Sequence, residues 1–235
     1  MSVELVAERV VGMFAKPVVP GDVKTRLTPP LTPERAARLY GAFLGDLAAM
    51  LDAGKDSFDW MVFTPAPQAL RNTWPEDTPA PSVIERQTGA DLGARMDHAL
   101  TTLLAPPGRK AAVIIGSDAP TVDRHQIDLA FAKLEHHDLV FGPAWDGGYY
   151  LVGASAPHGE VFGDIVWSSP DVLSETLKRV RAHDLRAGFL PPWYDVDEAQ
   201  DLAFLRVHLQ AMLVEHGSAA PCPRTRTAMG LDPNA

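Results

Sequence analysis

The sequence predicts an α/β fold built in layers, and two observations support this prediction. Short apolar runs typical of strands alternate along the chain with segments whose apolar residues recur every three or four positions, as on one face of a helix. Neither an internal repeat nor a stretch with the composition of a linker interrupts this alternation. We therefore expect a single domain over residues 1–216, followed by an irregular tail over residues 217–235 that is rich in Pro, Gly, Thr and Ala.

The first expected elements are a buried strand and a long amphipathic helix. Residues 9–14 form a short β-rich run, and a proline-rich loop follows them. Thr32 and Pro33 mark the start of the helix, because Thr is a good N-cap and Pro suits the first helical position. The apolar residues behind them are spaced by three and four and form one stripe along about five turns: Ala36, Leu39, Tyr40, Phe43, Leu44, Leu47 and Leu51.

The remaining elements alternate in the same way. The clearest of them is the run 111–115, where five consecutive apolar residues indicate a buried strand. The others are expected in this order: strand 58–64, weak helix 65–71, strand 83–84, a helix capped by Asp91, helix 123–134, strands 139–141 and 149–152, and helices 170–180 and 198–214.

The composition argues against several classes of protein. The 235 residues carry a net charge of −9, whereas proteins that hold nucleic acid usually present a broad basic surface. Cys222 is the single cysteine, so no intramolecular disulfide can form, which fits a reducing cytoplasm. No stretch approaches the roughly 18 apolar residues of a membrane helix. The acidic N-terminus lacks the pattern of a signal peptide. We expect a cytoplasmic protein without a membrane span, and nothing in the sequence indicates its oligomeric state.

A cationic loop follows the first strand. Lys16, Lys24 and Arg26 fall within eleven residues of an otherwise acidic chain. Ligands of α/β sheets bind beyond the carboxyl ends of the strands, and Lys and Arg suit phosphate oxygens. Gly21 would let the backbone approach such a ligand closely. These four residues are candidates for phosphate binding, and Lys24 is also a candidate catalytic cation. The P-loop spacing is absent, and a solvated proline-rich loop is an equal alternative.

Asp118 stands in Gly116-Ser117-Asp118, directly after the clearest strand. Its carboxylate would point from the strand end into a cleft, and Mg²⁺ or Mn²⁺ prefers such oxygen ligands. The alternative is that Asp118 caps the next helix. Asp123 is better placed for that cap, so we predict that Asp118 binds metal and takes part in catalysis.

The segment Asp146-Gly147-Gly148 stands between two expected strands. Asp-Gly is a strong hairpin signal, and paired glycines also make room for a substrate beside the backbone. Trp145 and Tyr149 offer flat faces for a sugar or a base. We predict that Asp146, Gly147, Gly148 and Tyr149 contact substrate, with Asp146 as a catalytic base or as a group that orients the acceptor.

Asp195 and Asp197 precede the last long helix. Alternate residues of an extended segment share a face, so the two carboxylates can point together and would then need a cation between them. A second metal contact is one solution. An acidic helix N-terminus, stabilised by the helix dipole, is a strong alternative.

Gln87 and Arg95 frame the segment QTGADLGARM. We predict that Gln87 contacts the nucleotide and that Arg95 contacts the substrate. Asp91 between them is explained as a helix cap.

Six ordered motifs together resemble a known family. They are FAKPVVPGDVKTRL, QTGADLGARM, GSDAPTV, GPAWDGGYYLVG, VWSSPDVLSETL and YDVDEAQDL, and the resemblance covers about residues 9–205. They resemble the DUF2064 family, also called radical-SAM/selenodomain-associated transferase 1 proteins, of the nucleotide-diphospho-sugar transferase superfamily. Trp145 is unusual at its position in that family.

The resemblance implies a three-layer α/β/α sandwich with a mostly parallel central sheet, a glycosyltransferase-A-like fold. It implies that Asp118 matches the superfamily's metal-binding Asp and, less firmly, that Asp195 or Asp197 matches a second metal position. The implied cofactor is Mg²⁺ or Mn²⁺. The implied partners are a nucleotide or nucleotide sugar and a small-molecule acceptor.

Three functions follow as hypotheses. The first is a metal-dependent glycosyltransferase, with charge on the departing diphosphate neutralised by metal and by the loop cations. The second is a nucleotidyltransferase resembling guanylyltransferases, since three cations suit a triphosphate at least as well as a nucleotide sugar. The third is a nucleotide-binding protein without turnover.

Overall fold

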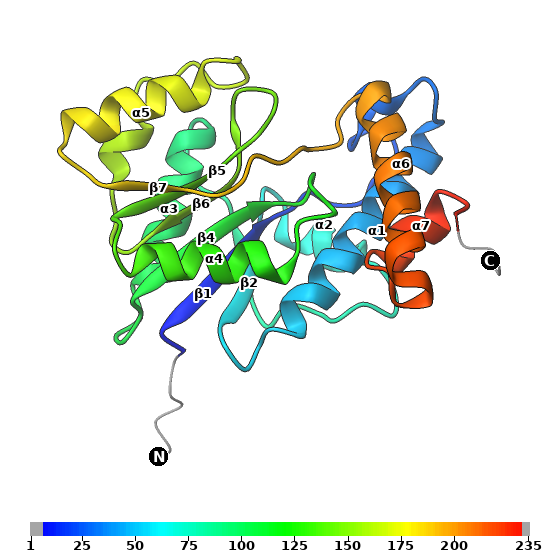
Figure 1. The fold of residues 1–235 in the computed structure, drawn as a ribbon, viewed down its shortest axis with the longest axis horizontal. Helices are drawn as coiled ribbons and strands as arrows, with labels where there is room; N and C mark the ends of the chain where they lie inside the picture. Colours follow the sequence, from blue (N-terminus) through cyan, green and yellow to red (C-terminus); the bar gives the residue numbers. More distant parts are fainter. Residues whose placement is uncertain (1–6, 232–235) are drawn as a thin grey trace.

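A seven-stranded sheet runs through the centre of the molecule (Figure 1). In the computed structural model, which describes residues 7–231, the strands lie in the order β3-β2-β1-β4-β6-β5-β7. Strand β6 is antiparallel to both of its neighbours, and every other pairing is parallel. The α/β fold with a mostly parallel sheet is confirmed. The strands are β1 Arg9–Phe14, β2 Asp59–Thr64, β3 Ile84–Arg86, β4 Ala111–Gly116, β5 Leu139–Pro143, β6 Tyr149–Ala154 and β7 Ala187–Phe189.

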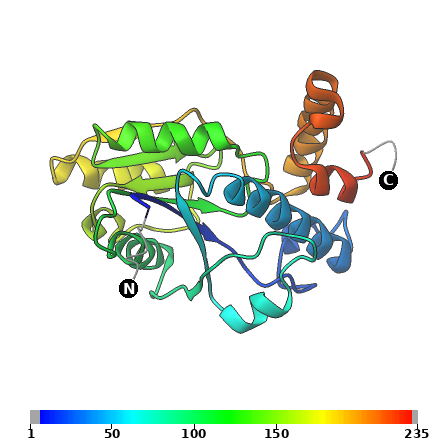
Figure 2. The same cartoon turned by 90° about the horizontal axis from the view of Figure 1, so that it is seen from below.

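Helices cover both faces of the sheet. Figure 2 shows α4 and α3 on opposite sides of it, which gives the expected three layers. The α-helices are α1 Pro33–Asp52, α2 Pro67–Asn72, α3 Leu92–Leu104, α4 Arg124–Leu134, α5 Val172–Ala182, α6 Ala199–His216 and α7 Pro223–Ala228. Short 3₁₀ helices span Thr25–Leu27, Gly159–Phe162 and Gly217–Ala219.

The predicted helix starts are formed by the predicted caps. The Thr32 side chain accepts a hydrogen bond from the backbone N–H of Arg35, with Pro33 in the first helical position. Asp123 and Gln126 form a reciprocal capping box at the start of α4. Asp123, and not Asp118, therefore caps this helix, and the carboxylate of Asp118 is left for another role.

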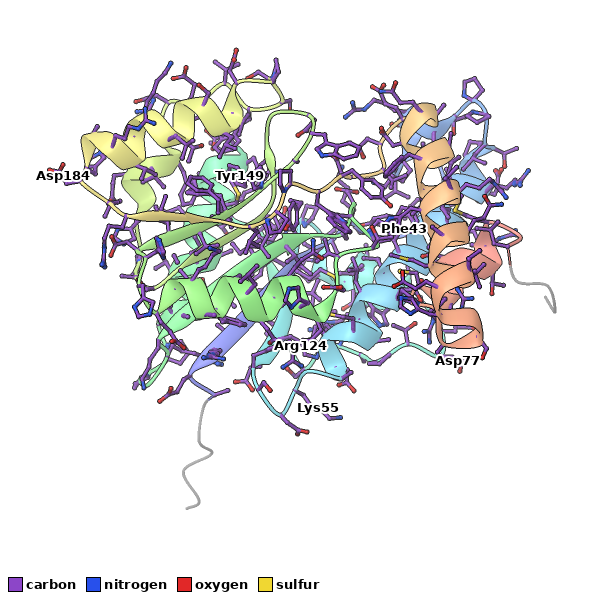
Figure 3. The ribbon with its side chains drawn as sticks, viewed as in Figure 1. Phe43, Lys55, Asp77, Arg124, Tyr149 and Asp184 are labelled. Carbon is purple, nitrogen blue, oxygen red and sulfur yellow. The ribbon has the colours of Figure 1, made fainter. Side chains whose placement is uncertain are left out.

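Alternate residues of the strands pack into two apolar clusters, one on each face of the sheet. On β4, Val113 and Ile115 pack with α1 and α4, whereas Ala112 and Ile114 pack with α3 and α5. Fully burying one such large apolar side chain contributes about 1.5–3 kcal/mol. Figure 3 shows the contrast between interior side chains such as Phe43 and peripheral ones such as Lys55 and Asp184.

The prediction of an irregular tail from residue 217 is wrong for part of it. Helix α7 packs against α1, where the buried Asp46 carboxylate accepts hydrogen bonds from the backbone N–H groups of Arg224 (3.1 Å) and Thr225 (2.8 Å). A proline-rich sequence without periodicity gives no sign of this helix, because its stability comes from a buried cap on another element. Strand β7, at the edge of the sheet, was also not predicted, since two of its three residues, Ala187 and Gly188, are uncommon in strands. Residues 232–235 lie outside the described part of the chain.

The candidate residues follow the same edge of the sheet. The loops after β1, β3 and β4 leave the carboxyl ends of parallel strands, and the β5–β6 turn reaches the same edge because Leu151 of β6 pairs with Ile115 near the end of β4. Within residues 7–231, no helix is long and apolar enough to cross a membrane.

Candidate functional site

Lys24 lies at the centre of the charged residues on this edge. Its Nζ atom donates hydrogen bonds to Asp118 Oδ1 and to Asp197 Oδ1, the second at 3.0 Å, and its side chain is only 3% exposed. Burial alone lowers the pKa of this ammonium group, but the two carboxylates outweigh burial and raise the pKa above its usual value. Lys24 is therefore a fixed positive charge between two acids that lie 79 residues apart in the sequence.

The loop that carries Lys24 is anchored at several points. Tyr40 on α1 accepts a hydrogen bond from the backbone N–H of Lys16 (2.9 Å), and Thr73 accepts one from Val18 (2.9 Å). Farther along the loop, the side chains of Val23 and Leu27 are buried. The proline-rich loop is therefore an ordered segment that presents Lys24 from a fixed backbone.

Arg26 extends the charged cluster towards solvent. Its guanidinium contacts Asp197 Oδ2 at 3.3 Å and Glu198 Oε1 at 3.4 Å, with a side chain that is 67% exposed. An exposed pair of this kind contributes little to stability, because water screens it. Two of the three predicted loop cations thus converge on the acids before α6, while Lys16 is exposed.

The segment between β7 and α6 brings in the second group of carboxylates. Figure 1 shows this orange segment crossing from the sheet to α6. The backbone N–H of Val196 donates to the carbonyl of Asp118 at 2.9 Å, and the Val196 side chain is fully buried. This contact places Asp195 and Asp197 beside Asp118.

Asp195 is the most perturbed carboxyl of the cluster. Burial, followed by the nearby carboxylates of Asp146 and Asp197, raises the pKa of Asp195 to about 6. A smaller contribution comes from Asp118. Four of the predicted acids therefore share one electrostatic environment, in which negative charge is only partly compensated.

Two other acids cap helix α6. Glu198 is the N-cap residue and forms a capping box with Asp201, whose Oδ2 accepts hydrogen bonds from the N–H groups of Asp197 (3.0 Å) and Glu198 (2.7 Å). The side chains of Asp195 and Asp197 are not needed for this cap. The acidic start of helix α6 is thus explained by Glu198 and Asp201, and it does not account for Asp195 and Asp197.

The predicted turn between β5 and β6 is present. Asp146 Oδ1 accepts a hydrogen bond from the N–H of Gly148 at 2.8 Å, and Asp146 remains exposed. Gly147 has φ +92°, and a Cβ atom there would lie 2.0 Å from the carbonyl oxygen of Pro170. Gly147 is required by this close packing, so space for a substrate is not needed to explain it.

Trp145 begins an aromatic cluster beside the turn. Its ring lies 5.3 Å from that of Phe204 on α6 and 5.9 Å from that of Tyr194, and its side chain is 66% exposed. Tyr194 is buried and bonds to His208 Nδ1 at 2.7 Å. The cluster therefore presents one large aromatic face to solvent next to Asp146.

Three predicted residues have local partners away from Lys24. Gly21, at φ +88°, follows Pro20 in a turn closed by a hydrogen bond from the N–H of Asp22 to Val19, which explains the glycine. Gln87 donates its side-chain amide to the carbonyl of Phe63. Arg95 Nε donates to the carbonyl of Gly89 at 3.4 Å. Binding roles for these three residues stay predictions.

Tyr149 does not face the site. Its ring packs edge-on against Phe141, its hydroxyl is buried, and burial raises its pKa. The alternation of side chains along β6 sends Tyr149 into the core on the α3 and α5 face. Its predicted contact with substrate stays a prediction that this orientation does not support, because a tyrosine after a glycine pair gives no indication of which face it will take.

Two residues at the site, Tyr40 and Ser117, were missed in the sequence. Tyr40, expected only as a core residue of α1, also bonds through its hydroxyl to Ser117 Oγ at 2.8 Å, directly before Asp118. Its ring lies 5.8 Å from Lys24 Nζ. The available signal was the hydroxyl group of Tyr40, a polar atom on an otherwise apolar face of the helix.

The residues fit a divalent cation by their chemistry. Asp118 and Asp197 supply hard oxygen donors, and both already face one positive charge on Lys24. Mg²⁺ and Mn²⁺ often take only one or two protein carboxylates, with phosphates and water completing the shell. Among residues 7–231 no three acidic, His or Cys side chains converge closely enough to hold an ion by themselves.

Comparison with protein families identifies the chain. The sequence model of a family described as uncharacterized protein conserved in bacteria (DUF2064) matches residues 50–169. The chain belongs to this family. A comparison with curated proteins finds no match.

Solved structures share the fold of this DUF2064 protein. One, from Desulfovibrio desulfuricans G20 and provisionally named a nucleotide-diphospho-sugar transferase, is 29% identical, with a TM-score of 0.81 over 97% of this chain and 99% of that one. A 4-diphosphocytidyl-2C-methyl-D-erythritol synthase from Anaerococcus prevotii is 8% identical, with a TM-score of 0.55 over 86% and 99%. A cytidylyltransferase from Leptospira borgpetersenii is 12% identical, with a TM-score of 0.52 over 97% and 96%. The last two are similar in fold alone. Together with the family, the 29% identical structure supports the classification of this protein as a transferase.

Proposed function

We propose that this protein is a divalent-metal-dependent transferase that moves a sugar from a nucleotide-sugar donor to a small-molecule acceptor. The observation that carries the proposal is the convergence of Asp118 and Asp197 on the buried ammonium of Lys24. Such an arrangement combines oxygen donors for a metal with a preorganised cation for phosphate oxygens. The Desulfovibrio desulfuricans protein, provisionally named a nucleotide-diphospho-sugar transferase, adds support.

Each charged residue has a role in this proposal. Asp118 and Asp197 would hold Mg²⁺ or Mn²⁺. The bound metal would supply neutralisation of the negative charge on the diphosphate leaving group. Lys24 and Arg26 would donate hydrogen bonds to the same phosphate oxygens and stabilise their charge as the glycosidic C–O bond breaks.

The acids on the other side of the cluster would serve the acceptor. Asp195, whose pKa is raised to about 6, is ionised near neutral pH yet basic enough to take a proton from an acceptor hydroxyl. Asp146 uses Oδ1 to hold its turn, so its second oxygen is available to orient the acceptor. These roles divide the work that the sequence assigned to Asp146 alone.

A nucleotidyltransferase is the second candidate, and the loop after β1 favours it. Three cations there suit a triphosphate, which carries more negative charge than the diphosphate of a nucleotide sugar. Lys24 and Arg26 would then stabilise departing pyrophosphate while a phosphorylated acceptor attacks the α-phosphorus.

Phosphorus NMR distinguishes the candidates. The protein is incubated with Mg²⁺, small acceptors, and either the nucleoside triphosphates or a panel of nucleotide sugars. We expect a nucleoside diphosphate to be released from one nucleotide sugar. Pyrophosphate release from a triphosphate, with all nucleotide sugars intact, would establish the second candidate instead.

Asp118→Asn tests whether this site is responsible. We expect it to abolish metal-dependent nucleotide binding in calorimetry, while Asp128→Asn, a matched change on the exposed face of α4, leaves binding unchanged. Binding that survives Asp118→Asn and needs no metal would contradict the proposal. Metal-dependent binding without any product in either incubation would instead indicate a nucleotide-binding protein without turnover.

A further inference from the structure

A cavity of about 300 Å³ lies between α1, α6 and α7, apart from the carboxylate cluster. Its volume equals that of about ten water molecules in the liquid, at the lower end of the range of small-molecule sites. The residues that decide its chemistry are Arg35, Arg38 and Leu39 of α1, Leu202 and Arg206 of α6, and Met229 after α7.

The lining of this cavity is cationic. Three of its side chains are arginines and none is acidic, although the whole chain carries a net charge of −9. Arg35 and Arg38 form no ion pair with any other residue between 7 and 231. Arg206 is held in the wall, because its Nη2 atom donates to the carbonyl of Met229 at 2.8 Å. Three arginine side chains from two helices, all of them exposed, therefore line one space that no acidic side chain lines.

The floor of the same cavity is apolar. Leu39 is 4% exposed, and Leu202 and Met229 pack against the larger apolar cluster. A fully hydrated ion such as inorganic phosphate would leave this floor in contact with water. A ligand that covers the floor and also meets the arginines must have an apolar body and a negatively charged head.

We propose that this cavity is a second ligand site, which binds a small amphipathic anion with a phosphate or carboxylate head on an apolar body. The head pairs with Arg38 and Arg206, and the body lies over Leu39 and Leu202. The cavity and the site already described meet adjacent residues at the start of α6, since Ala199 lines the cavity and directly follows Glu198, which contacts Arg26.

The test uses 1-naphthyl phosphate as the probe, measured by calorimetry on the full chain. Inorganic phosphate lacks the apolar body and 1-naphthol lacks the charge, so both are compared with it. We expect saturable one-site binding of 1-naphthyl phosphate, at least about tenfold tighter than either comparison probe. Absence of saturable binding, or equal affinity for inorganic phosphate, would overturn the proposal.

Variants assign the binding to this cavity. Arg38→Gln and Arg206→Gln should each weaken binding about tenfold, whereas Arg71→Gln, on the exposed end of α2, should leave it unchanged. Lys16→Gln controls for phosphate binding at the loop after β1 and should also have no effect. Thermal unfolding of each variant confirms that it is folded; undiminished binding in folded Arg38→Gln and Arg206→Gln would refute the site.

A substitution tests for a different occupant. The Asp232→Asn variant should bind 1-naphthyl phosphate with the same affinity as the original protein. More than tenfold tighter binding in Asp232→Asn would show that this acidic residue competes for the arginines. That result would assign the cavity to the chain itself and overturn the proposal.

Discussion

The two sides of the site at the carboxyl edge of the sheet differ in how their side chains are partnered. On one side, Lys24 is 3% exposed and bonded to two carboxylates, and Arg26 contacts two acids. On the other side, Trp145 is 66% exposed and Asp146 has one carboxylate oxygen without an assigned partner. The charged groups of the first side are held in position by each other, whereas the second side has an exposed ring and a carboxylate oxygen open to solvent.

This difference suggests how a transferase can separate two tasks. Charge stabilisation needs groups whose positions are already set, because reorienting them costs free energy at the moment of reaction. Recognition of an acceptor depends on contacts that form only when it binds, and an exposed aromatic ring provides such contacts. We therefore propose that the nucleotide phosphates bind at Lys24 and the acceptor at Trp145.

The largest effect is expected on the fixed side. Lys24→Met should lower turnover about 100- to 1000-fold, because the cation that faces the leaving group is lost. It should also lower the free energy of unfolding by about 1–3 kcal/mol, since Asp118 and Asp197 then repel each other without a shared cation. Both quantities are measured, by product release and by urea unfolding.

Unfolding measured with and without Mg²⁺ adds a second test of the same residues. If Asp118 and Asp197 bind the metal, Mg²⁺ should stabilise Lys24→Met more than it stabilises the original protein. The exposed Lys55, which pairs with Asp52, is the matched control, and Lys55→Met should change neither turnover nor stability by a measurable amount. Equal turnover in Lys24→Met and Lys55→Met would remove Lys24 from the site.

The next effect concerns the turn that supports the open side. Gly147→Ala should lower the free energy of unfolding by about 2–3 kcal/mol, because φ is +92° and the new Cβ would collide with the carbonyl of Pro170. Gly163→Ala is its control, since φ there is −72° and the added Cβ meets no atom within 4 Å. Urea unfolding of both variants gives the comparison, and similar losses would show that the turn is not constrained as described.

A smaller effect is expected from the exposed ring itself. Trp145→Ala should leave nucleotide affinity unchanged within about twofold and lower the ratio of transfer to donor hydrolysis about tenfold, a loss of about 1.4 kcal/mol. Calorimetry and product analysis measure the two quantities. The control is Val214→Ala, which changes an exposed apolar side chain on α6 and should alter neither quantity. A Trp145→Ala variant that loses nucleotide affinity instead would place the ring on the nucleotide side.

The sequence predicted the elements of the fold because their signals are local. Thr32, Asp91 and Asp123 are caps that act within three residues, and the structure has all three. The packing of α7 on α1 was missed, because it depends on Asp46, about 180 residues away, and no local pattern reports such a contact.

The sequence named the charged residues that meet at this edge as candidates, but it did not predict how they pair. The position of Asp118 after a buried strand and the pair Asp195 and Asp197 indicated carboxylates at one edge. That Lys24 would lie between them could not be predicted, since the contact spans 94 residues to Asp118 and depends on how the segment before α6 crosses the sheet. The direction of the Tyr149 side chain could not be predicted either, because the face of a strand residue is set by register.

The smallest effect separates two cations of one loop. Arg26→Ala should change the free energy of unfolding by less than about 0.5 kcal/mol, because its side chain is 67% exposed and its pairs with Asp197 and Glu198 are screened. Its contribution to nucleotide affinity should be a few-fold in dilute buffer and should fade as salt rises, whereas that of Lys24 should persist because burial protects it. Calorimetric titrations at low and high salt distinguish the two. Arg26→Ala and Lys24→Met could instead lose the same nucleotide affinity with the same salt dependence. In that case burial would not distinguish the two cations, and the exposed Arg26 would be as important for binding as Lys24.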